Sequence, residues 1–532
     1  MYNGANLEGD PRLEREENGH DFLEPVQDHQ GKVTFEEYLA AAKRQREYEE
    51  NEHKGISPSP DSVSTNEKSS KAAEVQESAL TAEEMERINA RRALRSASWA
   101  AVFYLITTDI LGPFNAPYAI SQTGYVPGVI LYFVMGVAAC YTGLLLWWLF
   151  LHLDSDTFPV KTYSDLAERI YGRTSRHIVS ILQSIQLIIN VGTICLSNGQ
   201  SLSQISKGHL CFAVCIVIWA IVGMGIGQIR SLKSYGWLAN SAVWINLAII
   251  FISMGFVAHS PPNYAAAESA YGIGIGPIEK SAFVSLPLSS KVNGIMNMVF
   301  AYGGAMIFPE MLAEMRRPWD FWKGMCCAQL LIFVAYLLYG LFVYSYQGQY
   351  TLGLAYQGVS KYAWQTVGNV LALITGIIAA GLYGNIGIKV AYYSIVEDMF
   401  GGPPLISRAG RFIWTGMVFL YWALAFIVGA AIPQVQTISG LVAAICIMQF
   451  TYTFPPALIF GFYFLKDGRD SSGRISWYQG FFGGYWWFKI FNFFLALAAL
   501  SMACLGMYGS GTAIQETFKT SQATSFGCAA PV

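Results

Sequence analysis

The stretch TTDILGPFNAPYAISQTGY, residues 107 to 125, decides the fold because it places helix-breaking residues inside an apolar run of membrane length. Pro113 and Pro117 lack a backbone donor, and Gly112 tolerates conformations that other residues avoid. We therefore predict that this helix breaks near residues 112 to 117. Broken backbone inside a bilayer must face protein or a water-filled cavity. A simple proline kink is the alternative interpretation, since membrane helices often contain proline.

The rest of the chain has the composition of a multi-pass, all-α integral membrane protein. Of its 532 residues, 53% are hydrophobic, 14% aromatic and only 13% charged. A bilayer-spanning helix needs about 20 mostly apolar residues, which predicts about eleven transmembrane helices. They are residues 98–121, 126–151, 177–202, 209–228, 236–258, 292–315, 323–346, 364–392, 409–432, 434–465 and 486–514.

A second interruption lies in VNGIMNMVFAYGGAMIFPEMLAEMRRP, residues 292 to 318, where Gly303 and Gly304 precede Pro309. The first break opens a set of five helices, residues 98–258, and the second opens another set, residues 292–465. Matching broken helices in two halves are typical of inverted-repeat secondary transporters, whose substrate sites lie near the bilayer midplane. Residues 486–514 would add one further helix to a transporter domain spanning residues 98–515.

Four motifs also carry a family resemblance. They are GPFNAPYAISQTGYVPGVI (112–130), TYSDLAERIYG (162–172), FAYGGAMIFPEMLAEMRRPWDF (300–321) and IPQVQTISGLVAAICIMQFTYTFPPALIF (432–460). Over residues 95–515 the chain resembles the amino acid/auxin permease family, and its long tail is similar to that of fungal neutral amino-acid permeases. The resemblance implies a LeuT-like five-plus-five fold and proton-coupled amino-acid uptake. Members often carry a histidine where AYGGA stands at 301–305, so their detailed substrate contacts are not transferred.

An amino acid is a zwitterion, and broken helices offer groups for both of its charges. Freed amides between Gly112 and Ala116 would hold the carboxylate. Carbonyls around Ile110 and Leu111, and those of Phe300 to Tyr302, would accept from the ammonium. The predicted substrate-binding residues are Gly112, Pro113, Phe114, Asn115, Ala116, Phe300, Ala301, Tyr302, Gly303 and Gly304.

The side-chain pocket is expected to be apolar and uncharged. Phe114, Phe300 and Tyr302 are aromatic neighbours of the breaks and would form its floor. Apart from Asp109 and Glu310, no charged residue lies close to both breaks. The sequence therefore favours neutral amino acids, both aliphatic and aromatic.

Two carboxylates are candidates for proton coupling. Asp109 falls near mid-membrane, where ionisation is costly, so it would exchange a proton as access alternates or face the substrate ammonium. A structural hydrogen bond is the alternative. Glu310 follows the second break, but a pair with Arg316 or Arg317 would explain it equally well. Lys389 is explained by snorkelling to the interface.

Polar residues elsewhere have two interpretations. One face of the third helix carries Gln183, Gln186, Asn190, Thr193 and Ser197. They would line the cavity, with Gln186 and Asn190 as named candidates, or bond to neighbouring helices. In the eighth helix Asn385 is a third candidate lining residue, with helix packing as its default role. Sodium coupling would need oxygens from this helix, but Thr375 is expected too near the outer end.

The predicted energy source is a proton gradient, with no cofactor, metal site or nucleic-acid partner. All seven histidines fall in the tail or near helix ends, which argues against an enzyme. The remaining alternatives are a sodium-coupled transporter and a sensor that binds an amino acid without moving it. The nine cysteines show no CxxC spacing, and we interpret them as small core residues.

The predicted topology places residues 1–97 in the cytoplasm and the short tail, residues 516–532, outside the cell. Short loops on the inner side are rich in Lys and Arg, and the opposite side carries only Lys207, Lys280, Lys291, Lys361 and Lys519. No leader pattern opens the chain, and we expect the plasma membrane. In the largely disordered N-terminal tail, Thr34 and Thr81 start capping boxes, and regulatory partners are possible. The TYSDLAERIYG segment would lie as a helix along the inner membrane surface.

Overall fold

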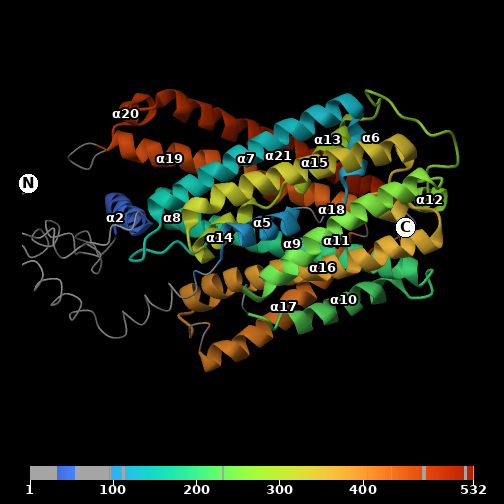
Figure 1. Ribbon diagram of the computed structural model, residues 1–532, viewed down its shortest axis with the longest axis horizontal. Helices are drawn as coiled ribbons and strands as arrows, with labels where there is room; N and C mark the ends of the chain where they lie inside the picture. The colour runs from blue at the N-terminus through green and yellow to red at the C-terminus, as the bar shows by residue number, and fades with distance from the viewer. Residues whose placement is uncertain are drawn as a thin grey trace, which may run out of the picture.

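The computed structural model describes residues 33–53, 95, 97–110, 114–230, 233–403, 405, 407–432, 434–469, 475–520 and 524–530. Over these ranges the protein is a bundle of helices with no strand, elongated along the helix axes (Figure 1). Nine of the helices there are long and apolar enough to span a membrane, and two shorter apolar helices, Trp99–Thr108 and Phe212–Ile226, add to them. The predicted all-α membrane fold is confirmed.

Both predicted breaks are present. The first helix consists of α5 (Trp99–Ile110) and α6 (Ala116–Thr123). The sixth consists of α13 (Leu288–Ala301), the 3-10 turn η2 (Ala305–Ile307) and α14 (Phe308–Glu314). Prolines stand in the first turn of α6 and of α14, where a missing amide costs nothing. Gly112, Pro113 and the side chain of Asp109 lie outside the described residues.

The remaining elements follow in the predicted order. In the first half they are α7 (Tyr125–Leu153), α8 (Tyr163–Tyr171), α9 (Arg173–Ile205), α10 (Phe212–Ile226), α11 (Lys233–Ala258) and α12 (Tyr264–Tyr271). In the second half they are η3 (Pro318–Asp320), α15 (Phe321–Gln347), η4 (Gly348–Tyr350), η5 (Ala355–Gly358), α16 (Tyr362–Ala391), η6 (Tyr392–Met399), α17 (Arg408–Ala431), α18 (Val435–Val442), η7 (Ala443–Thr453), α19 (Phe454–Gly468), α20 (Trp477–Phe482) and α21 (Trp486–Thr520).

Counterpart helices of the two halves pack in pairs: α6 with α13, α7 with α15, α9 with α16 and α10 with α17. The broken helices run in opposite directions. The start of α7, just after α6, bonds to the loop before α13, through Tyr125 N to Ser281 O (3.3 Å). At the other end, Ala97 before α5 bonds to Glu314 O at the end of α14 (3.0 Å). Antiparallel counterparts are what an inverted repeat requires.

The helices form two packed groups. One contains both broken helices together with α7 and α15, and the other contains α9, α10, α16 and α17. Helix α11 contacts members of both groups. The breaks therefore lie where one group faces the other.

The tenth helix is not the continuous α-helix that the sequence predicts. Its middle, η7, is a π-helix, and Thr453 donates back to Met448 O (3.1 Å) five residues earlier. Pro455 and Pro456 follow in the first turn of α19. Because neither proline donates an amide, the preceding backbone is free to widen.

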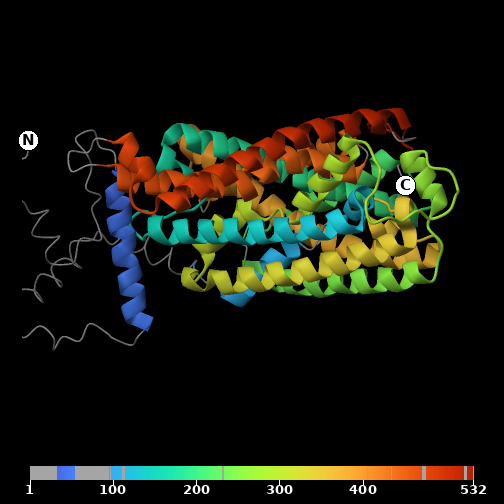
Figure 2. The same ribbon diagram turned by 90° about the horizontal axis from the view of Figure 1, so that it is seen from above.

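At one end of the bundle, here called the α2 end, the tail helix α2 (Phe35–His53) lies across the helix axes (Figure 2). The predicted capping box is confirmed, since Thr34 N donates to Glu37 Oε2 (2.8 Å) and Glu37 N to Thr34 Oγ1 (3.4 Å). This helix is docked, with Phe35 buried against Phe462. The second predicted tail helix, at Thr81, lies outside the described residues.

A buried carboxylate, Asp154, ties this end together. Its Oδ2 accepts from Arg46 of α2 and from Arg95 ahead of α5, both at 3.0 Å. Its Oδ1 accepts from Val160 N, also at 3.0 Å. One residue at the end of α7 thus joins the tail helix, the entry to the first broken helix and the following loop.

The inner-loop helix is confirmed as α8, but its apolar face contacts protein instead of a membrane surface. Tyr163, Leu166, Ala167 and Ile170 are buried, and Tyr163 donates to Phe450 O (3.2 Å). Tyr171, expected on the same face, is 51% exposed.

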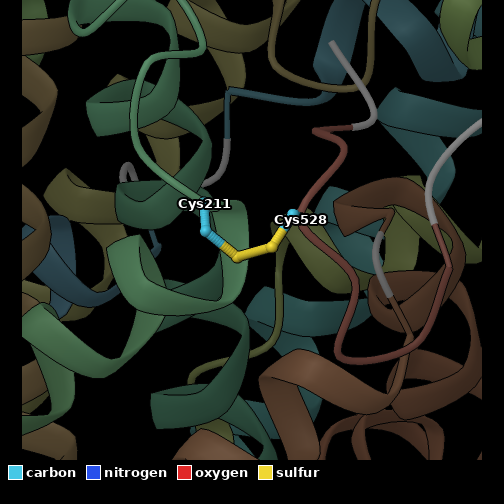
Figure 3. The surroundings of a disulfide bond; sticks show 2 residues. All are labelled: Cys211 and Cys528. Atoms are coloured by element: carbon cyan, nitrogen blue, oxygen red, sulfur yellow. A yellow bond between two sulfur atoms is a disulfide. The ribbon is translucent and has the colours of Figure 1, made fainter.

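At the opposite end, here called the α12 end, Cys211 and Cys528 form a disulfide (Figure 3). The prediction that all cysteines are core residues is therefore wrong for this pair, and Cys327 and Cys504 are exposed. The C-terminal segment returns to the start of α10, where Phe212 N donates to Cys528 O (3.1 Å) and Ala213 N to Gly527 O (3.2 Å). Spacing in the sequence cannot reveal a contact 317 residues apart.

Large apolar side chains cover the outside of the bundle, among them Phe133, Ile221, Phe251, Leu330 and Phe419. A soluble protein would bury such residues, whereas the hydrocarbon of a bilayer solvates them.

Replacing Asp154 by Asn tests whether its ion pairs stabilise the α2 end of the bundle. Breaking a buried ion pair costs about 3–5 kcal/mol because the partner charge stays buried. Arg46 and Arg95 are both affected, so we expect a clear fall in the melting temperature of the purified protein. Glu47→Gln, in the exposed pair with Lys43, is the control and should change little. Equal melting temperatures for the two variants would contradict this role of Asp154.

Candidate functional site

A cavity of about 90 Å³ lies where the two groups of helices meet. It is lined by Phe114, Asn115, Asn190, Thr193, Ile194, Ser197, Asn198, Asn246, Phe300, Leu354, Tyr356, Ala372, Thr375, Gly376, Ala379, Tyr383, Val435 and Ser439. The broken helices, α9, α11, α16, α18 and the η5 segment all contribute. A water molecule needs roughly 10–15 Å³ on this scale, so the cavity has room for a small organic molecule.

Three of the predicted substrate-binding residues line this cavity: Phe114 and Asn115 at the first break and Phe300 at the second. Ala116, Ala301, Tyr302, Gly303 and Gly304 are not among its lining residues. Tyr302, expected on the pocket floor, donates to Tyr132 O of α7 (3.0 Å). Its ring therefore points from α13 toward α7 and serves packing within one group of helices.

The polar face of α9 divides between two roles. Asn190, Thr193 and Ser197 line the cavity, whereas Gln183 and Gln186 do not. Asn385 does not line it either. Its Nδ2 donates to Ile229 O (2.6 Å) beyond α10, so its contact links two helices of one group.

The position of Thr375 differs from the one expected from the sequence. The sequence places it too near the outer end to approach the first break, but it lines the same cavity as Asn115. The unbroken helix α16 starts at Tyr362 and Thr375 lies in its middle. The eighth helix therefore contributes a hydroxyl-bearing residue to the cavity that the first break lines.

Several lining residues were not predicted from the sequence, notably Asn198, Asn246, Tyr356 and Ser439. Asn246 lies in the apolar part of α11, and a polar residue at membrane depth is itself a signal of function. Tyr356 lies in a loop that packs over the break, with its ring 5.3 Å from that of Phe114. No periodic pattern places that loop there.

Four polar atoms of the lining residues lack hydrogen-bond partners. Asn115 Oδ1, Asn190 Oδ1, Asn246 Oδ1 and Ser439 Oγ are all buried with no hydrogen-bond partner in the protein. Leaving such a group unsatisfied costs about 1–3 kcal/mol. Four of them around one cavity indicate a place for a polar ligand or ordered water.

An amide network fixes the orientation of Asn115. Its Nδ2 donates to Asn297 Oδ1 (2.8 Å), which leaves Asn115 Oδ1 for the cavity. Asn297 in turn donates to Asn293 O (2.8 Å) and Gln436 O (3.1 Å). The network therefore joins the first break to α13 and α18.

The carbonyls at the second break are not unpaired, as the sequence led us to expect. Phe300 O accepts from Gly303 N and Tyr302 O from Gly304 N, both at 3.1 Å. A tight turn closes the end of α13, in which Phe300 O also accepts from Tyr302 N. Both oxygens are therefore already bonded within the protein.

Glu310 lies outside this cavity, on α14, and its contacts differ from those expected. Its Oε1 accepts from Gln183 Nε2 (2.7 Å) and from Tyr163 N (3.2 Å), and not from Arg316 or Arg317. Its Oε2 is buried without a partner. Lys389 was predicted to extend its side chain to the membrane interface. Its Nζ lies 3.7 Å from Glu314 Oε1, so the two form an ion pair.

A second, wider hollow of about 870 Å³ lies at the α12 end. Tyr118, Tyr271, Asn293, Gln434 and Gln436 are among its lining residues. Asn293 and Gln436 also contact Asn297, so the amide network leads from this hollow to the first break.

Comparison with known proteins identifies the family. The model of the transmembrane amino acid transporter protein family matches residues 95–467, and the chain belongs to this family. The resemblance found in the sequence is thereby confirmed.

Several relatives align over most of the chain. A "Transmembrane transporter" of Fusarium pseudograminearum (strain CS3096) is 25% identical over 82% of this chain and 87% of its own. The "N amino acid transport system protein" of Neurospora crassa is 24% identical over 78% and 83%. "Amino acid transporter AVT1B" of Arabidopsis thaliana is 24% identical over 65% and 61%.

Gly376 offers a test of the cavity. A Cβ at this position would lie 2.4 Å from Asn198 Oδ1, so alanine would push the Asn198 amide into the cavity. We expect Gly376→Ala to raise the KM for amino-acid uptake about tenfold, which corresponds to ~1.4 kcal/mol. The control is Gly416→Ala, whose Cβ meets open space. An unchanged KM in Gly376→Ala would separate this cavity from the substrate site.

Proposed function

We propose that this protein is a secondary active transporter that imports neutral amino acids by proton symport and alternating access. The observation that carries the proposal is the cavity that both helix breaks line, with four unpartnered polar atoms and no Asp, Glu, Lys or Arg among its lining residues. A charged substrate side chain buried there without a counter-ion would be costly.

The two broken helices give the substrate backbone its partners. The amide end of α6, beginning at Ala116, carries a partial positive charge suited to a carboxylate. Asn115 Oδ1, oriented by Asn297, is an acceptor suited to the ammonium.

Alternating access would move α5, α6, α7, α13, α14 and α15 against the group of α9, α10, α16 and α17. The packing supports this, because contacts are extensive within each group and the cavity lies between them. At the α2 end Ala97 bonds to Glu314 at the end of α14, while the wide hollow lies at the α12 end.

Glu310 is the proposed coupling group, with Asp109 as the other candidate. Glu310 lies on the moving α14, and its partner Gln183 lies on α9 of the opposing group. Protonation would remove the charge that Gln183 stabilises and so weaken a bond between the two groups. The competing proposal is sodium coupling, in which oxygens of Thr375 and of the first break would bind the ion.

The proposed topology has the α2 end in the cytoplasm and the α12 end outside the plasma membrane. The Cys211–Cys528 bond supports this, because disulfides persist in oxidising compartments. Lys and Arg concentrate in the loops of the other side, as expected of cytoplasmic loops.

Purified protein in proteoliposomes tests the transport mechanism. Labelled leucine, phenylalanine, serine and glutamine would be offered under a proton gradient and then a sodium gradient. We expect accumulation with protons alone. Glu310→Gln should abolish accumulation but retain exchange of internal for external amino acid, because exchange needs no net proton movement.

The control for this experiment is Glu268→Gln, an exposed position on α12. If Asp109→Asn abolishes accumulation and Glu310→Gln does not, coupling resides at Asp109. Accumulation driven only by sodium would overturn proton symport. Binding without accumulation under either gradient would leave the sensor alternative.

Epitope tags at the two ends test the topology. A C-terminal tag should bind antibody on intact cells, and an N-terminal tag only after permeabilisation. The reverse pattern would contradict the orientation. A C-terminal tag that is protected inside isolated vacuoles would place the protein in the vacuolar membrane.

A further inference from the structure

We infer that the cavity selects neutral amino acids with a hydrogen-bond-donating side chain, a carboxamide above all, over aliphatic ones. This inference rests on the proposed function and names the substrate class for the same site. It replaces the expectation of aliphatic and aromatic substrates that the sequence produced.

The side-chain end of the cavity is supplied by the unbroken helices. If the breaks hold the carboxylate and the ammonium, the substrate side chain points to α9, α11 and α16. Asn190 of α9 and Asn246 of α11 face it there, 4% and 1% exposed, and the Oδ1 atom of each lacks a partner. An aliphatic side chain would leave both oxygens unsatisfied.

The neighbouring hydroxyls also present acceptors. Thr193 donates its hydrogen to Ile189 O (2.9 Å) and Ser197 to Ile194 O (3.0 Å), each on its own helix. Thr375 likewise donates to Ala372 O (3.3 Å). Their lone pairs remain for the cavity.

An uncharged, largely apolar site with a few amide and hydroxyl groups fits a neutral side chain that both donates and accepts hydrogen bonds. The two N–H groups of a carboxamide match the two orphaned asparagine oxygens. A cationic side chain would also donate, but no Asp or Glu lines the cavity to balance its charge.

Volume disfavours large aromatic substrates and does not separate a carboxamide from leucine, which has about as many non-hydrogen atoms. At roughly 10–15 Å³ for each water-sized site, a cavity of about 90 Å³ holds roughly six to nine such sites. This is close to the number of non-hydrogen atoms in asparagine or glutamine and far below that in tryptophan.

The experiment compares glutamine with leucine, which differ little in size, by their kcat/KM for uptake into proteoliposomes. We expect wild type to prefer glutamine at least about tenfold. Asn190→Leu and Asn246→Leu keep the side-chain volume and remove the amide, so each should lower the glutamine-to-leucine ratio about tenfold.

Asn369→Leu is the matched control. Asn369 is fully buried on α16 and its Oδ1 also lacks a partner, but it does not line the cavity. The glutamine-to-leucine ratio of this variant should equal that of wild type. A lower yield of protein would not change the ratio, because both substrates are measured on the same folded protein.

Two outcomes overturn the inference. A wild type that prefers leucine, or ratios unchanged in both cavity variants, would remove the selective role of Asn190 and Asn246 while leaving the transporter intact. Stabilisation of the detergent-solubilised protein by each amino acid is the second measurement. If nothing is transported but glutamine stabilises the protein at lower concentrations than leucine, the transport proposal fails and the selectivity stands. If neither amino acid stabilises it, both fail.

Discussion

The constraint on which this structure depends is that backbone groups released inside a membrane must find partners in the protein. At the first break, Phe114 O accepts from Ala355 N of the η5 segment (3.3 Å), and Asn115 bonds through its side chain to Asn297. Water cannot supply these bonds in hydrocarbon, so each one pulls another element against the break. The loop carrying Tyr356, the helix α13 and the helix α18 are all gathered in this way, and the cavity is what lies between them.

The two ends of the bundle are closed by different chemistry. At the α2 end, charges on the tail helix and ahead of α5 converge on Asp154, and Ala97 joins the first broken helix to the sixth. At the α12 end, a covalent bond holds the C-terminal segment on α10. The contacts at the α2 end are ion pairs and backbone hydrogen bonds, whereas the contact at the α12 end is covalent and joins α10 to the C-terminal segment.

Where interpretation of single residues went wrong, a partner distant in the sequence was responsible. Glu310 was weighed against nearby arginines, but Gln183 from another helix is its partner. Lys389, on α16, faces Glu314 on α14, a helix of the other packed group. Tyr302 turns toward α7 and leaves the pocket, while Asn246 and Ser439, unremarkable in sequence, enter it. Local patterns describe the backbone well because proline, glycine and apolar length act locally. They carry no information on which faces meet.

The sequence by itself determined the all-helical membrane fold, about eleven spans, both broken helices and the capping box of α2. These follow from hydrophobic length and from residues that cannot continue a helix. It also identified six candidates that line the cavity: Phe114, Asn115, Asn190, Thr193, Ser197 and Phe300. Only the tertiary structure decided the remaining lining residues, the Cys211–Cys528 bond and the docking of α2. Each of these depends on side chains brought together from distant segments, and their positions are fixed by packing and by the need to satisfy buried polar groups.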